Sequence, residues 1–329
     1  MQNDVYTEHN PRCRSFELTL RTGGRAMKKK NDKKDRLVRI SSFLFIDEYE
    51  RRVGEVRGVV FNKFMTLLNH DLKADHGIDM KLPHCWYRWG DEVVKYYLSR
   101  YTRWDHEDLT ATTVSWKGDV PDMDLEGPMV SKIREYVDEF ITSYSGEDGW
   151  EMAIDRLYGL APYDFQNEYR KLRENLKETR GGFYIQDYYS NILLPLFDRA
   201  LASFPSKFSD IAKEKECFES VVRECVRENV PIEDVRDIVE EFWFFFCYHL
   251  RVDKSCHENV SNETLNIWRS SIPWEDELYI RSLQDRASKL ANASDKNIID
   301  LQRERDKRIG EFEDLLDEFR ASDTRYGKM

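Results

Sequence analysis

Apolar side chains recur three and four residues apart along most of this chain, and few glycines or prolines interrupt them. The stripe from Val56 to Leu72 is one example, and the stripe from Ile133 to Ile141 is another. This spacing places one apolar face along an α-helix. The 329 residues include only 15 glycines and 9 prolines, which favours long helices over many hairpins. The sequence therefore predicts a mainly α-helical fold.

Three segments are expected along the chain. Residues 1–36 are a basic leader, which is predicted to be disordered. Residues 37–178 are predicted to form a helical module with one strand near Thr110–Lys117, where β-branched residues precede a Gly-Asp pair. Two glycines within Glu178–Gly182 mark the boundary. Residues 183–322 then form a helical domain with long C-terminal helices.

The middle of the first module carries a dense aromatic segment, Leu82–Gly90. Its proline and glycine interrupt a helix, so a packed turn is expected there. A further helix is expected at about residues 91–101, where apolar residues again recur at helical spacing. Helices and one strand in this order suggest a module of winged-helix type.

The charge is distributed unevenly. The whole chain has a net charge of −11, but residues 1–36 contain ten basic and five acidic side chains. An acidic body disfavours binding to nucleic acid or to an anionic membrane surface. The leader, with its basic block Lys28–Arg36, could still contact DNA. Met27 beside this block is an alternative start, so whether residues 1–26 belong to the native protein is left open.

The six cysteines are scattered and form no CxxC pair, which favours reduced thiols over a disulfide framework. The first residues lack the apolar stretch of a secretory signal. The most apolar run, Phe242–Leu250, is nine residues long and has charged flanks, whereas a membrane span needs about 20 residues. We interpret this run as a buried helix of a soluble, cytoplasmic protein without a membrane segment.

Two groups of histidine and cysteine could form a metal site. Zinc needs about four ligands that converge in a tetrahedron, usually as closely spaced pairs. Neither group has a zinc-finger spacing, and on one helix Cys247 and His249 would point about 200° apart. Buried cysteines and hydrogen-bonded histidines are therefore expected, with no metal and no cofactor. The candidate ligands are His70, His76, His84 and Cys85 in the first group, and Cys247, Cys256 and His257 in the second.

Common catalytic motifs are absent from the sequence. The patterns GxSxG, GxxxxGK[ST], GxGxxG and HExxH do not occur. Glu240 and Glu241 precede the aromatic run, and one of them could face inward with a raised pKa. However, 62 carboxylates make accidental neighbours common. These observations disfavour the common enzyme classes, and we predict no catalytic residue.

The rings of the aromatic segment have two interpretations. Trp86, Tyr87 and Trp89 could form a platform that binds a ligand or a side chain of a partner. Alternatively, they fill the junction between the helices on either side. If they are exposed, the acidic charge of the body favours a protein partner over RNA.

The aromatic segment also carries a family resemblance. With a helix that ends near Gly77 before it and Asp91–Val94 after it, the segment resembles the Panacea antitoxin-like family. In that family the aromatic stretch ends in a Tyr-x-x-Gly-Pro-Val type of turn, whereas Asp91-Glu92 stands here in place of the proline. Ala161–Tyr169 is similar to segments of uncharacterised archaeal proteins with that arrangement. The resemblance covers about residues 37–178 and implies a small helical, winged-helix-like module that binds protein.

Three functions are left open. The leading prediction is a non-enzymatic regulatory protein whose partner is another protein. The second is a winged-helix DNA binder that uses Lys28–Arg36 and the helix at residues 91–101, although Asp91 and Glu92 would repel phosphate there. The third is a metal-dependent hydrolase built from the histidines and cysteines. The oligomeric state is also left open.

Overall fold

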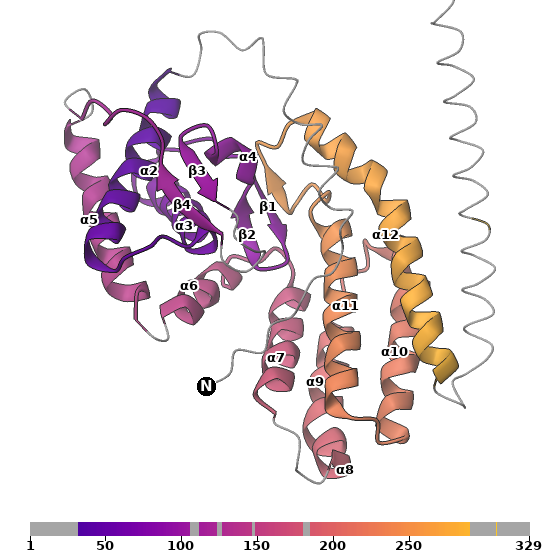
Figure 1. Cartoon of the computed structure of the whole chain (residues 1–329). Coiled ribbons are helices and arrows are strands. Elements are labelled where there is room, and N and C mark those ends of the chain that lie inside the picture. Colours follow the sequence, from indigo (N-terminus) through magenta and orange to yellow (C-terminus); the bar gives the residue numbers. More distant parts are fainter. Residues whose placement is uncertain are drawn as a thin grey trace, which may run out of the picture. The chain divides into compact units, whose positions relative to one another are not determined.

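The computed structural model describes residues 32–105, 112–123, 127–146, 149–179, 185–289 and 307 (Figure 1). Helices dominate these residues, so the fold is mainly α, as the sequence predicts. The chain divides into two compact units. The first unit comprises Met1–Leu82 and Val93–Ala153, and the second comprises Pro83–Glu92 and Ile154–Met329.

Several expectations concern residues outside the described ranges. These residues include most of the basic leader and, apart from Lys307, the tail beyond residue 289. The expectations for them stay predictions. The boundary expected at residues 178–182 lies within the range of the second unit.

The first unit is built on α2 (Asp32–Arg52), α3 (Gly58–His76) and α5 (Gly127–Tyr144). Its core is aromatic. The rings of Phe45 and Phe64 stack with their centroids 4.0 Å apart, and Phe140 meets them edge-on at 5.6 and 5.1 Å. Offset-stacked and edge-on rings are the favoured pairings of aromatic side chains. The apolar stripes that predicted these helices therefore meet in one core.

A two-stranded ribbon follows in the same unit. Strands β3 (Thr102–Asp105) and β4 (Thr113–Trp116) are antiparallel, and β4 confirms the predicted strand over its described residues. The segment before α3 runs along β4, because the Val114 N–H donates to the Val56 carbonyl at 2.9 Å. At Gly58 a Cβ atom would lie 2.6 Å from the Trp104 ring, so only glycine fits without a shift. The winged-helix detail of the prediction is not confirmed by this arrangement.

The prediction of a helix at residues 91–101 is wrong. Gly90–Val93 is strand β2, and only Lys95–Leu98 is helical, as α4. A buried side chain of α3 holds the backbone here, because the Asn62 amide donates to the Val93 carbonyl at 2.7 Å and accepts its N–H at 2.9 Å. These two hydrogen bonds to a residue far away in the sequence satisfy the N–H and the carbonyl of Val93 without a helix. The local apolar spacing does not reveal it.

The second unit is a helical bundle. Figure 1 shows its long helices side by side, and they contact one another. The π-helical turn η2 (Tyr189–Leu193) joins α8 to α9, and the short turn η3 (Ser209–Ile211) precedes α10. The helix α6 (Gly149–Tyr158) leads into this unit. The bundle helices are α7 (Asp164–Glu178), α8 (Ile185–Tyr188), α9 (Leu194–Ala202), α10 (Ala212–Arg227), α11 (Ile232–Leu250) and α12 (Asn262–Lys289).

The aromatic run on α11 lies at the centre of this bundle. Phe242 stacks on Phe218 of α10 with ring centroids 4.1 Å apart, and Phe245 stacks on Tyr279 of α12 at 4.3 Å. All four rings are buried. The interpretation of this run as a buried helix is confirmed. No helix within the described ranges is long and apolar enough to cross a lipid bilayer.

The aromatic segment forms strands rather than a turn alone. Strand β1 (His84–Tyr87) pairs antiparallel with β5 (His257–Glu258), and β2 lies on its other side. The turn between β1 and β2 is confined to Arg88 and Trp89. Gly90 after the turn has φ +91°, a backbone conformation that glycine adopts without strain. The expected packed turn is thus corrected to a hairpin.

We expect Phe242→Ala to lower the free energy of unfolding by about 3–5 kcal/mol, because it removes a fully buried ring from the stacked core. Urea denaturation followed by circular dichroism measures the loss. Leu278→Ala is the control, since this α12 side chain is 38% exposed and should change stability by less than about 1 kcal/mol. Equal losses for the two variants would contradict the central position of Phe242.

Candidate functional site

The three rings of the aromatic segment have different environments within the second unit. Trp86 is buried and meets Tyr158 edge-on, with ring centroids 5.5 Å apart. Tyr87 is half-buried and packs on Tyr248 of α11. Trp89 lies in the hairpin turn and is 45% exposed. Of the three, Trp89 is therefore the side chain that a partner can reach most easily.

Two cations of α7 lie close to the exposed indole. The guanidinium carbon of Arg173 is 5.8 Å from the Trp89 ring centroid, and the Lys177 ammonium is 5.5 Å from it. Residues four apart on a helix share one face, which explains why both reach the same ring. A cation within about 6 Å of an indole is attracted to the ring. We call Trp89, Arg173 and Lys177 the Trp89 surface.

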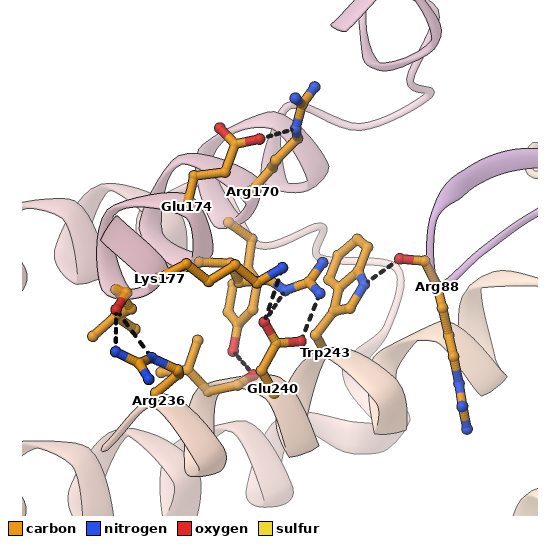
Figure 2. A network of polar contacts seen from close by, with 11 residues as sticks. Arg88, Arg170, Glu174, Lys177, Arg236, Glu240 and Trp243 are labelled. Carbon is orange, nitrogen blue, oxygen red and sulfur yellow. Dashed lines mark hydrogen bonds and ion pairs between the residues drawn. The ribbon is translucent and has the colours of Figure 1, made fainter. Parts of the chain in front are cut away.

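A buried ion pair with Glu240, which is labelled in Figure 2, anchors the Arg173 guanidinium of this surface. Glu240 of α11 accepts hydrogen bonds from Arg173 Nε at 3.0 Å and from Nη2 at 2.6 Å. The Arg173 side chain is 5% exposed and that of Glu240 is 14% exposed. Burial acts to lower the pKa of Arg173, but the charge and hydrogen bonds of Glu240 outweigh it and raise that pKa. Two parallel bonds of this kind set the orientation of the guanidinium.

Further hydrogen bonds hold the two elements that carry the surface, as Figure 2 shows. The Trp243 indole N–H donates to the Arg88 carbonyl at 2.9 Å, which ties the hairpin to α11. Arg236 donates to the Leu176 carbonyl at 2.8 and 3.0 Å and to the Thr179 carbonyl at 3.1 Å. These carbonyls at the end of α7 lack partners within their own helix. The hairpin and α7 are therefore both anchored on α11.

A second aromatic and cationic cluster lies behind the hairpin turn. The Arg88 guanidinium is 4.3 Å from the Phe244 ring centroid and donates to the Tyr248 hydroxyl at 3.2 Å. Arg251 lies over the rings of Tyr248 and Trp268, at 4.6 and 5.2 Å. Burial raises the pKa of Tyr248, so its hydroxyl stays protonated at neutral pH. This cluster packs the hairpin against α11 and α12.

The ribbon of β1 and β5 brings together four of the candidate metal ligands: His84, Cys85, Cys256 and His257. Both imidazole nitrogens of His84 face carboxylates, with Nδ1 2.9 Å from Asp91 and Nε2 3.5 Å from Glu258. Burial acts to lower the pKa of His84, but these two carboxylates outweigh it and raise the pKa. Burial and the charge of Arg269 lower the pKa of His257.

The remaining candidate ligands lie elsewhere. His70 and His76 belong to α3 of the first unit, and Cys247 is fully buried on α11. Taken alone, neither unit brings three histidine, cysteine or carboxylate ligand atoms of its described residues within reach of one ion. The expectation of no metal stays a prediction.

Two of the cysteines and both glutamates singled out in the sequence lie in the second unit. Burial raises the pKa of the Cys247 and Cys256 thiols, whereas an activated cysteine needs a lowered pKa. Glu240 does face inward, but its carboxylate is bound to Arg173. Glu241 accepts a hydrogen bond from Ser282 at 2.6 Å and pairs with Arg286.

The chain matches no protein-family model, and no curated protein and no solved structure matches it. Functional inference therefore depends on the geometry of the Trp89 surface.

The sequence names Trp89 as a binding candidate but gives no reason to name Arg173 and Lys177. Both lie on α7, and in the sequence they look like ordinary surface cations of a helix. Their spacing of four residues indicates a shared face, but no local pattern connects that face to the hairpin.

We expect Glu240→Gln to lower the free energy of unfolding by about 3 kcal/mol, because it leaves the Arg173 guanidinium buried without a carboxylate. Urea denaturation measures this loss. The double variant Arg173→Met, Glu240→Leu should lose less free energy of unfolding than Arg173→Met and Glu240→Leu lose in sum as single variants, since no buried charge remains. Glu168→Gln, which breaks an exposed pair with Lys171, should cost less than about 1 kcal/mol. Strict additivity of the two buried substitutions would contradict the ion pair.

The carboxylates around His84 also make stability depend on pH. A histidine whose pKa is raised on folding stabilises the protein below its unfolded pKa of 6.5, and this contribution is lost as the pH rises through the folded value. We therefore expect the stability difference between the wild type and His84→Gln to be larger at about pH 5.5 than at about pH 8.5. Urea denaturation at both pH values measures it. A difference independent of pH would refute the assignment.

Proposed function

We propose that this chain is a non-enzymatic regulatory protein that binds another protein through the Trp89 surface. The observation that supports this most is an exposed indole held by a buried ion pair. Trp89 is 45% exposed, yet the Arg173 guanidinium beside it is fixed by the two hydrogen bonds that it donates to Glu240. Tryptophan and arginine are enriched among the residues that contribute most to protein interfaces.

Preorganisation gives this surface a second advantage. Ordering a flexible side chain on binding costs about 0.5–1.5 kcal/mol. The hairpin and α7 are already anchored on α11 through Trp243 and Arg236, so a partner would meet a surface that is largely ordered. We include in this proposal the resemblance of residues 37–178 to the Panacea antitoxin-like family, which implies protein binding. A neighbouring gene for a small toxin would support that part of the proposal.

A winged-helix DNA binder is the second prediction. The recognition helix that it needs at residues 91–101 is not formed, because this segment contains β2 and the four-residue α4. A salt-titrated DNA-binding assay tests it, and absence of affinity at low salt would reject it. Metal analysis of the purified protein tests the third prediction, a metal-dependent hydrolase, and absence of bound zinc and iron would count against it.

We expect Trp89→Ala to weaken binding of the partner by about 30-fold, the effect of losing a central interface residue. Proteins that copurify with the full chain from its native host supply the partner, and calorimetry with the purified pair measures the dissociation constant. Trp274→Ala is the matched control, because Trp274 on α12 is 40% exposed and lies outside the Trp89 surface. This control should bind within about twofold of the wild type.

The proposal fails if no partner binds in a defined ratio, or if the two tryptophan variants bind equally well. Circular dichroism of each variant confirms that the fold is retained.

A further inference from the structure

The charges around Trp89 indicate what kind of partner would bind there. Arg170 pairs with Asp155 and Glu174, and Arg173 pairs with Glu240. Lys177 is the fourth charged residue of this α7 face, and its nearest carboxylate is also Glu240. Three cations of α7 thus share three carboxylates, one of which is bound on both oxygens by Arg173.

Lys177 is the cation best placed to meet a partner. Its side chain is 48% exposed, and its ammonium is 3.9 Å from Glu240, which is too long for a hydrogen bond. Burial is the main reason why the pKa of Lys177 is lowered; the charge of Arg173 acts in the same direction, whereas Glu240 and Glu174 oppose it. Arg236 adds a further positive charge nearby, and its hydrogen bonds go to backbone carbonyls.

We infer that the Trp89 surface recognises an acidic segment of a partner protein that also carries an apolar side chain. This inference rests on the proposed function and specifies the partner. An aspartate or glutamate of the partner would give Lys177 a carboxylate within hydrogen-bonding distance, which Glu240 at 3.9 Å does not provide, and the apolar side chain would cover the exposed indole. The whole chain has a net charge of −11, so Lys177 and Arg236 would distinguish an acidic partner locally rather than by general attraction.

Single-stranded RNA also combines negative charge with stacking rings, and it is the competing ligand class. Its phosphates would be repelled by the acidic body, whereas a short acidic segment needs to meet only Lys177 and Arg236. The geometry therefore favours the protein segment.

Selection from a displayed library of random 12-residue peptides on the immobilised full chain tests this inference. The wild type should enrich peptides with Asp or Glu beside Leu, Ile, Phe or Trp. The affinity of an enriched peptide should fall by about fivefold for Lys177→Met and further for Lys177→Glu. Lys177→Arg should retain it. Lys171→Glu is the matched control, because it changes the same helix by the same charge at a lysine that pairs with Glu168.

The outcomes separate this inference from the proposed function. Peptides that depend on Trp89 but show no acidic preference and no response to Lys177→Glu would overturn the acidic segment and leave protein binding intact. Peptides whose enrichment does not depend on Trp89 would overturn both. A fluorescent 12-nucleotide uridine strand that binds through Trp89 more tightly than any selected peptide would replace the protein segment with RNA.

Discussion

The second unit depends on the packing of the aromatic rings of α11 against its neighbouring helices. These rings contact α7, α10 and α12, and Trp243 also reaches the hairpin. Trp243 stacks on Tyr169 of α7 with ring centroids 5.6 Å apart, lies 5.2 Å from the Arg173 guanidinium and donates to the Arg88 carbonyl. One buried side chain therefore links the core to both elements of the Trp89 surface. A change in the packing of α11 would move the exposed indole and the cations together.

Local rules account for the parts of the fold that the sequence predicts well. The apolar stripes of α3, α5, α7, α10 and α11 follow the helical period, and each of these helices buries that stripe. Serine is a preferred residue just before a helix, and the hydroxyl of Ser261, which precedes α12, accepts the Thr264 N–H at 3.1 Å. Residues 91–101 show where such rules fail, because Asn62 holds Val93 through bonds that no local pattern contains.

The candidate site was predictable only in part. Composition singled out Trp86, Tyr87 and Trp89, but it did not reveal which ring is exposed, because that depends on where the hairpin turns. Trp86 lies within β1, where it is buried together with its neighbour Cys85, whereas the turn leaves Trp89 outside the strand. The cations that complete the surface come from α7, and the carboxylate that fixes one of them comes from α11. Contacts between distant segments are set by tertiary packing.

The Arg173–Glu240 pair is hard to explain by stability alone. Removing two charges from water costs several kcal/mol per ion, and apolar residues of similar volume often fill such a position equally well or better. The pair does supply a fixed orientation, because two parallel hydrogen bonds hold the guanidinium close to the Trp89 ring. Arg173 also takes the hydrogen bonds of Glu240, so Lys177 beside the same ring pairs with this carboxylate only at 3.9 Å. Apolar residues in place of the pair would preserve the bundle but remove both charges. The pair is therefore better explained by its effect on the position and charge of the Trp89 surface.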